Sequence, residues 1–444
     1  MTIQDSVGHP DQRVALAPRL IGLGPSPTIA IQERANALAR AGRRVHRFGL
    51  GQSPFPVPRV VVDALRAHAD RKDYLPTAGL PELREAVAEY HRRRQRIERS
   101  ADAVLVGPGS KELMFLLQVA FDGEILIPTP AWVSYEPQAR ILGRLSTRLA
   151  HTGADRRLSP DALESMLEGE AWRPRVLILN YPNNPTGLTY APDELAALAA
   201  VCRRHGIVVL SDEIYGELHF EGAHASIATH LPEATIVSSG LSKWCGAGGW
   251  RLGTFLFPRE LAWLQEAMRV VASETFTSTS APIQYAAVSA FQGGLPIERY
   301  LARVRKILHA VALEVVRRIR EAGAAVAMPQ GAFYVFPDFG PARRALAARG
   351  IRTSRELCSR LLEEAGVACL PGSAFGRPPD ELTARLSLVD FDGSKALAAL
   401  EAMPQGADVD AAFIELHAHA VLEGVESLLR WVAEGPAAAA STRG

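Results

Sequence analysis

One stretch of the chain decides the fold, because it places a lysine and an arginine among small residues: Ser238-Ser-Gly-Leu-Ser-Lys-Trp-Cys-Gly-Ala-Gly-Gly-Trp-Arg-Leu-Gly253. It follows residues 235–237, an apolar run typical of a buried strand. A lysine becomes a nucleophilic amine where burial and nearby cations lower its pKa, and aldehyde cofactors use such amines as Schiff bases. An arginine can hold a phosphate through two parallel hydrogen bonds. Lys243 and Arg251 are therefore candidates for a cofactor site, although this stretch alone also fits a glycine-rich surface turn.

Outward from that stretch, short apolar runs alternate with longer amphipathic segments. The short runs have the pattern of buried strands in a parallel sheet: residues 103–106, 125–127, 176–179 and 207–210. The intervening segments have the pattern of helices: residues 113–120, 161–167 and 192–205. This alternation predicts an α/β fold whose large domain has a mostly parallel central sheet covered by helices, with ligands beyond the carboxyl ends of its strands.

The two ends of the chain predict a second, smaller α/β domain. Helices are expected at 29–41, 303–322 and 354–365, and strands at 45–50, 325–327, 333–336 and 384–389. We expect an N-terminal segment (1–60) that packs with the small domain, a large cofactor-binding domain (61–324) and a C-terminal small domain (325–444). Residues 390–406 are expected to form a loop or local insertion, and 434–444 a flexible tail.

Composition limits the classes of function. The 444 residues carry 49 Lys and Arg against 48 Asp and Glu, a net charge of +1 that provides no general attraction to nucleic acid or anionic membrane. The polar start lacks a secretory signal, and no apolar run reaches the roughly 18 residues of a membrane span. Four scattered cysteines without a CxxC pair argue against a zinc site or a disulfide framework. These features predict a cytoplasmic protein with no metal, nucleic-acid or membrane partner.

A second motif, Asn180-Tyr-Pro-Asn-Asn-Pro-Thr-Gly187, directly follows a predicted strand. Its prolines give the chain a rigid, non-helical exit, and Gly187 permits backbone angles that other residues avoid. The motif can aim Asn184 at a ligand as a neutral donor, or it can be a tight connection from strand to helix.

A third motif, Ser211-Asp-Glu-Ile-Tyr215, ends the predicted strand at 207–210. A carboxylate at the tip of a buried strand is costly unless it meets a cation. Asp212 facing a pyridinium nitrogen would meet that condition and keep the ring protonated as an electron sink. Tyr215 could donate to an oxygen of the same ring, whereas Glu213 and Glu217 are expected to be solvated residues on a helix face.

Three weaker signals complete the candidate site. Val106-Gly-Pro-Gly-Ser-Lys111 joins a strand to a helix and can cradle an anion, without the spacing of a Walker or dinucleotide-binding loop. Trp132 follows another strand, where it could stack on a planar ring or belong to the core. Arg385 lies in a strand-like run and suits either a bound carboxylate or an ordinary salt bridge.

In this order the motifs resemble those of the class I/II aminotransferases, which are pyridoxal-phosphate-dependent enzymes of fold type I. The resemblance spans about residues 26–389, and its most specific parts are Asn-Asn-Pro-Thr-Gly, Ser-Asp-Glu-Ile-Tyr and Ser-Lys followed by Gly-Trp-Arg-Leu-Gly. It implies pyridoxal 5'-phosphate on a Schiff base with Lys243. It also implies amino-group transfer from an L-amino acid to a 2-oxo acid, by a homodimer with shared active sites.

The resemblance also implies a role for each candidate residue. Lys243 would carry the catalytic proton, Asp212 would pair with the ring nitrogen, Asn184 and Tyr215 would contact the ring oxygen, and Trp132 would cover the ring. The residues implied at the phosphate are Gly109, Ser110, Lys111, Ser242 and Arg251, with Tyr74 reaching the partner's site. The residues implied at the substrate are Gly51, Trp132, Asn184 and Arg385.

Two other functions use the same resemblance. A β-lyase acting on a cysteine conjugate would need identical cofactor contacts, but it would release pyruvate and ammonia without a 2-oxo acid acceptor. A cofactor-binding domain of a transcription regulator would need a DNA-binding segment of roughly 60 residues, and the enzyme-like region begins too early to leave room for one. The sequence leaves aspartate, aromatic and aliphatic amino acids open as substrates, and favours a broad or aromatic/neutral preference slightly.

Overall fold

A seven-stranded, mostly parallel sheet forms the centre of the larger lobe in the computed structural model, which describes residues 17–143, 147–404 and 406–434. Its strands are β2 (Val104–Gly107), β3 (Glu124–Thr129), β4 (Thr147–His151), β5 (Arg175–Asn180), β6 (Ile207–Asp212), β7 (Thr235–Gly240) and β8 (Gly253–Leu256). Their order is β2-β8-β7-β6-β5-β3-β4. β8 runs antiparallel to both of its neighbours, β2 and β7, and the other neighbouring strands pair in parallel.

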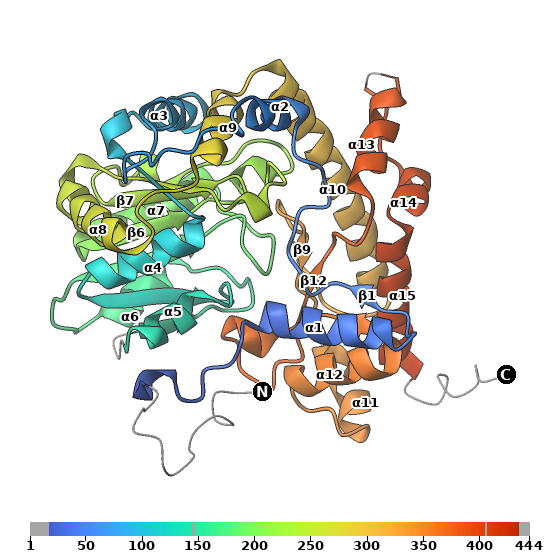
Figure 1. The fold of residues 1–444 in the computed structure, drawn as a ribbon. Coiled ribbons are helices and arrows are strands. Elements are labelled where there is room, and N and C mark those ends of the chain that lie inside the picture. The colour runs from blue at the N-terminus through green and yellow to red at the C-terminus, as the bar shows by residue number, and fades with distance from the viewer. Residues whose placement is uncertain (1–16, 144–146, 405, 435–444) are drawn as a thin grey trace, which may run out of the picture.

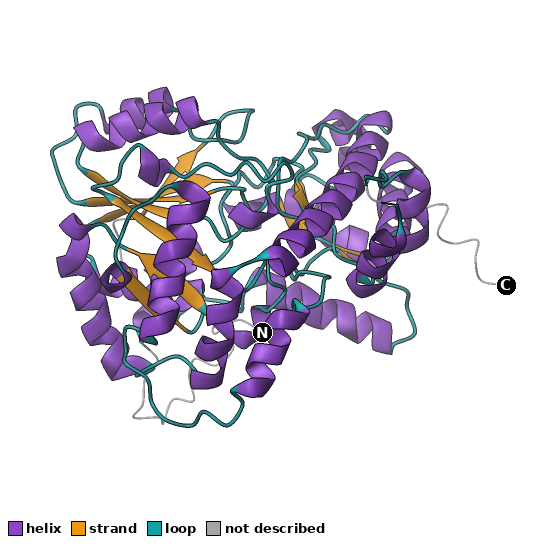
Figure 2. Ribbon diagram, turned by 90° about the horizontal axis from the view of Figure 1, so that it is seen from above, coloured by secondary structure: helices purple, strands orange, loops and turns teal. Residues whose placement is uncertain are grey.

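Helices cover both faces of this sheet (Figure 2). They are α2 (Arg59–Ala67), α3 (Pro81–Gln95), α4 (Ser110–Ala120), α5 (Tyr135–Ile141), α6 (Pro160–Leu167), α7 (Pro192–Arg204), α8 (Ala262–Thr275) and α9 (Ala281–Gln292). Successive strand residues point to opposite faces, so Leu210 packs with α4 and α8 while Val209 packs with α6 and α7. Burial on both faces explains the continuous apolar runs within β2, β3, β5 and β6, as expected for a parallel sheet covered by helices.

The five strands expected from the apolar runs are β2, β3, β5, β6 and β7, whereas β4 and β8 were not expected. β4 is an edge strand of mixed polarity, and three of its five residues are only half-buried. β8 begins at the last glycine of the Lys243 stretch, where glycine hides the pattern of a strand. Neither strand carries the continuous apolar run on which the prediction depended.

The smaller lobe contains two short sheets and the C-terminal helices (Figure 1). Its strands are β1 (His46–Arg47), β9 (Tyr334–Val335), β10 (Val367–Ala368), β11 (Leu370–Pro371) and β12 (Ala384–Ser387). Its helices are α1 (Pro27–Arg40), α10 (Leu295–Glu321), α11 (Arg343–Ala348), α12 (Ser354–Ala365), α13 (Gly393–Ala402), α14 (Ala411–His417) and α15 (His419–Glu434). β1 pairs in parallel with β10, so the N-terminal segment lies against C-terminal strands. The proposed boundaries at residues 60 and 324 stay predictions.

One expectation for this lobe, a strand at 325–327, is wrong; for residues 390–406 the expected loop is wrong, while the local insertion stays a prediction. Residues 325–327 form no strand; Ala325 makes only an isolated bridge to Asp338. Residues 390–406 contain α13, whose first turn is capped by the Asp392 carboxylate accepting from the backbone N–H groups of Ser394 and Lys395. The expected tail at 434–444 lies outside the described residues except for Glu434, the last residue of α15.

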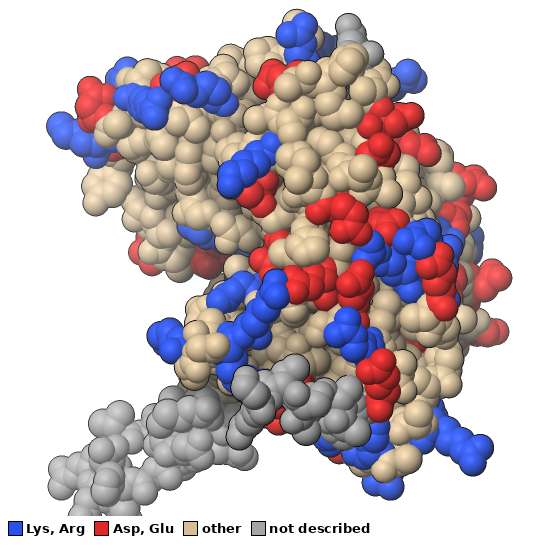
Figure 3. All heavy atoms as spheres, turned by 90° about the vertical axis from the view of Figure 1, so that its right-hand side faces the viewer, with Lys and Arg blue, Asp and Glu red and all other residues tan. Residues whose placement is uncertain are grey.

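The face of the small lobe shown in Figure 3 carries basic and acidic side chains side by side. Arg318 of α10, for example, pairs with Glu314 of the same helix, with Glu415 of α14 and with Glu426 of α15. No single sign of charge dominates this face. Within the described ranges, none of the helices is both long enough and apolar enough to cross a membrane.

Candidate active site

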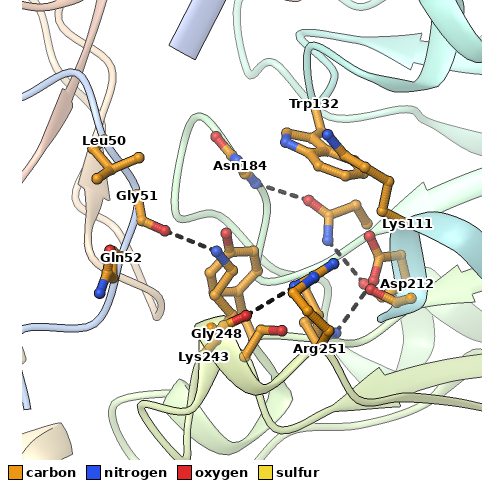
Figure 4. A pocket seen from close by; sticks show the side chains of 16 residues that line it. Leu50, Gly51, Gln52, Lys111, Trp132, Asn184, Asp212, Lys243, Gly248 and Arg251 are labelled. Atoms are coloured by element: carbon orange, nitrogen blue, oxygen red, sulfur yellow. Dashed lines mark hydrogen bonds between the residues drawn. The ribbon is translucent and has the colours of Figure 1, made fainter. Parts of the chain in front are cut away.

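A cavity of about 450 Å³ lies where β3, β5, β6 and β7 end, facing the segment that follows β1 (Figure 4). This volume is in the usual range for a small-molecule site. Ten of the residues singled out in the sequence line it: Gly51, Ser110, Lys111, Trp132, Asn184, Asp212, Tyr215, Ser242, Lys243 and Arg251. The other lining residues are Leu50, Gln52, Asn180, Ile214, Gly248 and Gly249. Motifs far apart in the chain meet here because parallel strands share a carboxyl edge.

Lys243 enters the cavity from the loop after β7 (Figure 4). Its Nζ donates a hydrogen bond of 2.8 Å to the backbone oxygen of Gly51. Burial and the positive charge of Arg385 lower the pKa of Lys243 to about 8, although the Asp212 carboxylate acts in the opposite direction. A substantial fraction of this amine is therefore neutral near pH 7, as a nucleophile requires.

Asp212 is the last residue of β6, and only 3% of its surface is exposed. Its Oδ2 accepts a hydrogen bond of 2.5 Å from the Tyr135 hydroxyl, and its Oδ1 accepts one of 3.4 Å from the backbone N–H of Ile214. Burial raises the pKa of Asp212 to about 6 despite these donors and the nearby charge of Lys243. The carboxylate can therefore still gain from a cationic partner in the cavity.

Tyr135 is a site residue that the sequence interpretation missed. It lies in the first turn of α5, three positions after Trp132, and its ring meets the Trp132 ring edge-on at 5.3 Å. The signal was its position just beyond a strand that points at the same edge of the sheet. Its partner, Asp212, is distant in the chain, so the hydrogen bond itself had no signature in the sequence.

Arg385 lies behind the cavity wall rather than on it. It is 1% exposed; its Nη1 donates to Asn184 Oδ1 at 3.2 Å, and its Nη2 donates to the backbone oxygen of Gly49. Asn184 is held in turn by Asn180, whose Oδ1 accepts from the Asn184 backbone N–H at 2.8 Å. In the described ranges no carboxylate pairs with Arg385. A buried guanidinium of this kind is stabilised by an incoming anion.

An anion cradle forms between the N-terminus of α4 and the residues that immediately precede β8. Gly109 has a φ of +98°, and a Cβ at this position would lie 2.2 Å from Arg251 Nη2. Lys111 and Arg251 both line the cavity, and burial together with the charge of Arg251 lowers the pKa of Lys111. Ser110 and Ser242 line the same cavity. Two neighbouring cations beside a helix N-terminus are suited to a phosphate dianion.

Two aromatic residues, Trp132 and Tyr215, line the cavity. The Trp132 ring lies 5.0 Å from Lys111 Nζ, measured to the ring centroid. Tyr215 is buried, which raises the pKa of its hydroxyl well above its usual value, and its oxygen lies 2.7 Å from the hydroxyl oxygen of Tyr334. Tyr74 is 88% exposed and does not line this cavity.

The expectation that Glu213 and Glu217 are solvated is wrong, because both side chains are buried. The chain after β6 turns into a short 3-10 helix, Gly216–Leu218, that packs inside the protein. His224 lies 2.8 Å from Glu213, and although burial favours the neutral acid, His224 and nearby hydroxyls lower the pKa of Glu213. Glu217 pairs with Arg305 at 2.6 Å and accepts from Tyr90 at 2.8 Å. Tyr90 comes from α3 and Arg305 from α10, whereas His224 lies in the loop that follows the 3-10 helix. These contacts offset the cost of burying two carboxylates.

Sequence comparison places the chain among enzymes that transfer amino groups. The family described as aminotransferase class I and II matches residues 43–397. An aspartate aminotransferase of Geobacillus stearothermophilus is 36% identical over 374 residues, which cover 82% of this chain and 92% of that enzyme. An aspartate/prephenate aminotransferase of Cereibacter sphaeroides is 34% identical, with coverage of 82% and 92%.

Solved structures agree with this placement. An aspartate aminotransferase of Thermus thermophilus with maleate has a TM-score of 0.79 and 28% identity, and the match covers 94% of this chain and 99% of that one. An aromatic aminotransferase of Pyrococcus horikoshii has a TM-score of 0.73 and 29% identity, with coverage of 89% and 98%. The predicted α/β fold, with its mostly parallel sheet and second smaller domain, is confirmed. The protein belongs to the class I and II aminotransferase family, and it is an aminotransferase.

Proposed function

We propose that this aminotransferase works with pyridoxal 5'-phosphate bound covalently to Lys243 and moves an amino group from an L-amino acid to a 2-oxo acid. One observation carries the proposal: an amine of lowered pKa, a buried acid and two cations that pair with no carboxylate of the described residues line one cavity. These three features correspond to the aldehyde, the ring nitrogen and the phosphate of that cofactor. The family membership supports the same cofactor.

The residues present fit this group in charge and in space. Lys111 and Arg251 supply two positive charges for the phosphate dianion, and no carboxylate among the described residues pairs with either. Arg251 Nη1 donates only to the Gly248 backbone oxygen, at 2.9 Å, which leaves its other nitrogen atoms available. A Cβ at Gly253 would lie 2.1 Å from the backbone nitrogen of Ser110, so this part of the cradle requires glycine.

When bound, pyridoxal phosphate supplies an aldehyde that condenses with amines and a ring that withdraws the electron pair left on the substrate's α-carbon. Asp212 would stabilise a positive charge on the ring nitrogen. Asn184 and Tyr215 would donate to the ring oxygen, since the Asn184 amide oxygen is already used by Arg385 while its NH₂ group remains available. Trp132 would cover one face of the ring.

Two residues act on the substrate itself. Arg385 would bind the α-carboxylate through its guanidinium, after exchanging its present bond to the Gly49 backbone oxygen for the ligand. With the cofactor in the site, the Lys243 amine would act as the base that takes the proton from the substrate's α-carbon and as the acid that gives it back during transfer of the amino group. The Gly51 backbone, which accepts a hydrogen bond from Lys243, leaves room for the substrate to approach.

The enzyme would work as a homodimer with shared active sites. Tyr74 lies on an exposed loop outside its own chain's cavity, which is where a residue lent to a partner would be. A tyrosine hydroxyl from the second subunit would add a neutral donor to the phosphate cradle of Ser110, Lys111, Ser242 and Arg251. Analytical ultracentrifugation of the purified protein distinguishes this dimer from a monomer.

A donor panel tests the reaction and narrows its substrate. L-Aspartate comes first, because the two sequence relatives named above are an aspartate aminotransferase and an aspartate/prephenate aminotransferase; an aromatic and an aliphatic amino acid follow. With 2-oxoglutarate as acceptor, we expect glutamate to form together with the 2-oxo acid of the donor. A β-lyase would instead form pyruvate and ammonia from a cysteine conjugate with no acceptor present, and that result would replace the proposal.

The pH dependence of cofactor loading follows from the pKa of Lys243. With a pKa of about 8, roughly one amine in ten is neutral at pH 7, against fewer than about one in a thousand for an ordinary lysine. We expect the rate of covalent incorporation of pyridoxal phosphate into apoprotein to rise with pH and level off above about pH 8. Stopped-flow absorbance measures this rate, with free Nα-acetyl-lysine as the control. A midpoint as high as that of the free lysine would contradict the assignment.

Tyr135→Phe tests whether the Asp212 carboxylate needs its phenolic donor. The substitution keeps the ring but removes a hydrogen bond to a charged group, which is worth about tenfold or more in affinity. We expect the dissociation constant for pyridoxal phosphate to rise by about that factor. Tyr190→Phe is the control, because it also removes a buried tyrosine hydroxyl, one that accepts from the Leu158 backbone outside the cavity. Equal effects of the two substitutions would show that Tyr135 contributes only to general stability.

A further inference from the structure

Tyr334 joins the two lobes at the site, although it does not line the cavity. It lies on β9 of the smaller lobe, is 1% exposed, and places its hydroxyl oxygen 2.7 Å from that of Tyr215, which follows β6 of the larger lobe. The roles implied by the resemblance to the aminotransferases do not include Tyr334.

Tyr334 also contacts two other candidate residues. The Arg385 guanidinium carbon lies 4.8 Å from the centroid of the Tyr334 ring. A Cβ at Gly51 would lie 2.0 Å from the Tyr334 hydroxyl oxygen, so glycine at position 51 and tyrosine at 334 depend on each other. The ring is therefore held between the arginine and the chain that forms the mouth of the cavity.

The direction of the hydrogen bond between the two tyrosines follows from counting protons. Among the described residues, Tyr215 is the one hydrogen-bonding partner of the Tyr334 hydroxyl. If Tyr215 donated its proton, the proton of Tyr334 would be buried without an acceptor, which is costly. If Tyr334 donates, its proton is satisfied and the proton of Tyr215 is free to turn toward the cavity that Tyr215 lines.

We propose that Tyr334 is a positioning residue: its hydroxyl donates to Tyr215, so that the Tyr215 hydroxyl points into the cavity as a preset donor to the bound cofactor. This inference rests on the proposed cofactor. Consecutive hydrogen bonds strengthen one another, so the Tyr334 bond makes Tyr215 a better donor to an anionic ring oxygen.

Three charged residues, Arg385, Asp212 and Lys243, lie near this pair of tyrosines. Arg385 of β12 lies over Tyr334, and its positive charge makes that phenol a better donor. Burial holds the pKa of Tyr215 well above its usual value, and the Asp212 carboxylate at the end of β6 adds to this, whereas the positive charge of Arg385 acts in the opposite direction. Lys243 Nζ lies 5.7 Å from the centroid of the Tyr215 ring. None of these groups accepts the Tyr334 proton in the described part of the chain.

Tyr334→Phe tests the proposal by a spectroscopic pH titration of protein loaded with pyridoxal phosphate. Without Tyr334, Tyr215 stabilises the negative ring oxygen less, so the chromophore keeps its proton to higher pH. We expect the midpoint of the absorbance change to move upward by about 0.5–1 pH unit, the effect of one buried hydrogen bond. We also expect the dissociation constant for the cofactor to rise a few-fold.

Tyr300→Phe is the matched control, because Tyr300 is a buried tyrosine whose hydroxyl has no hydrogen-bonding partner in the described structure. Its midpoint should equal that of the wild type. A Tyr334→Phe midpoint equal to that of Tyr300→Phe overturns the positioning role, provided that wild-type protein binds the cofactor. Failure of the wild type to bind pyridoxal phosphate would instead overturn the proposed function.

Gly51→Ala supplies a second, independent test. The added methyl displaces the Tyr334 hydroxyl from its bond with Tyr215 and should move the midpoint in the same direction as Tyr334→Phe. In the double variant the two shifts should not add, because both act on the same hydrogen bond. Fully additive shifts would show that Gly51 and Tyr334 act separately, and would contradict the proposal.

Discussion

Lys243→Ala is expected to reduce turnover by at least about 10³-fold, the largest effect of any single substitution in this protein. The substitution removes the cavity amine that donates a hydrogen bond to the Gly51 backbone oxygen. It therefore removes both the covalent attachment of the cofactor and the group that moves the proton. The Ala variant should still bind some pyridoxal phosphate, because the phosphate cradle and Asp212 remain.

Attachment can be measured separately from turnover. Reduction of the loaded wild type with borohydride, followed by peptide mass spectrometry, should find the added pyridoxyl phosphate on Lys243. The Ala variant should show no such mass on this peptide and no visible absorbance of the linked cofactor. Lys395→Ala serves as the control, since the Lys395 side chain is 81% exposed on α13. Turnover of the Lys243→Ala variant at the wild-type level would end the proposal.

Asp212→Asn is expected to have the second-largest effect, a loss of turnover of at least about 10²-fold. Asparagine has nearly the same volume and can still accept the Tyr135 hydrogen bond, but it carries no charge to stabilise a protonated ring nitrogen. The ring would then withdraw electrons less strongly from the α-carbon. The effect should therefore fall mainly on kcat, while the Michaelis constant for the amino acid changes little.

Single-turnover kinetics with a deuterated α-carbon measure this effect. In the Asn variant the removal of the α-hydrogen should become slower and more sensitive to the isotope, because the chemical step limits the rate. Asp102→Asn is the matched control, since its side chain is 90% exposed and pairs only loosely with Arg84, at 3.5 Å. If the two Asn variants had equal kcat values, Asp212 would have no electronic role.

Much of the candidate site could be predicted from the sequence because its residues sit next to recognisable strands. Asn184, Asp212 and Lys243 each follow an apolar run, and parallel strands that are covered on both faces bring their ends to one edge. Each motif lies within a few residues of its strand, so the sequence alone can predict where the motif is placed. The same reasoning failed for β8, which begins at Gly253 and has no continuous apolar run.

Residues whose role depends on a partner elsewhere in the chain could not be predicted in this way. Tyr135 and Tyr334 carry ordinary aromatic side chains, and their hydroxyls gain a role only beside Asp212 and Tyr215. Glu213 is the opposite case. The local sequence pattern predicts a side chain exposed to solvent, but Glu213 is buried in the folded protein, where His224 pairs with it.

The chain alone therefore determined the class of fold and the family, and it supplied the candidate reactive residues, since hydrophobic periodicity and short motifs are properties of neighbouring residues. Only the tertiary structure decided how those residues are tuned. Burial beside Arg385 brings the pKa of Lys243 down to about 8, and burial of the β6 terminus brings the pKa of Asp212 up to about 6. Desolvation and the distances between charges depend on how distant segments pack, and neither is encoded in any short stretch of sequence.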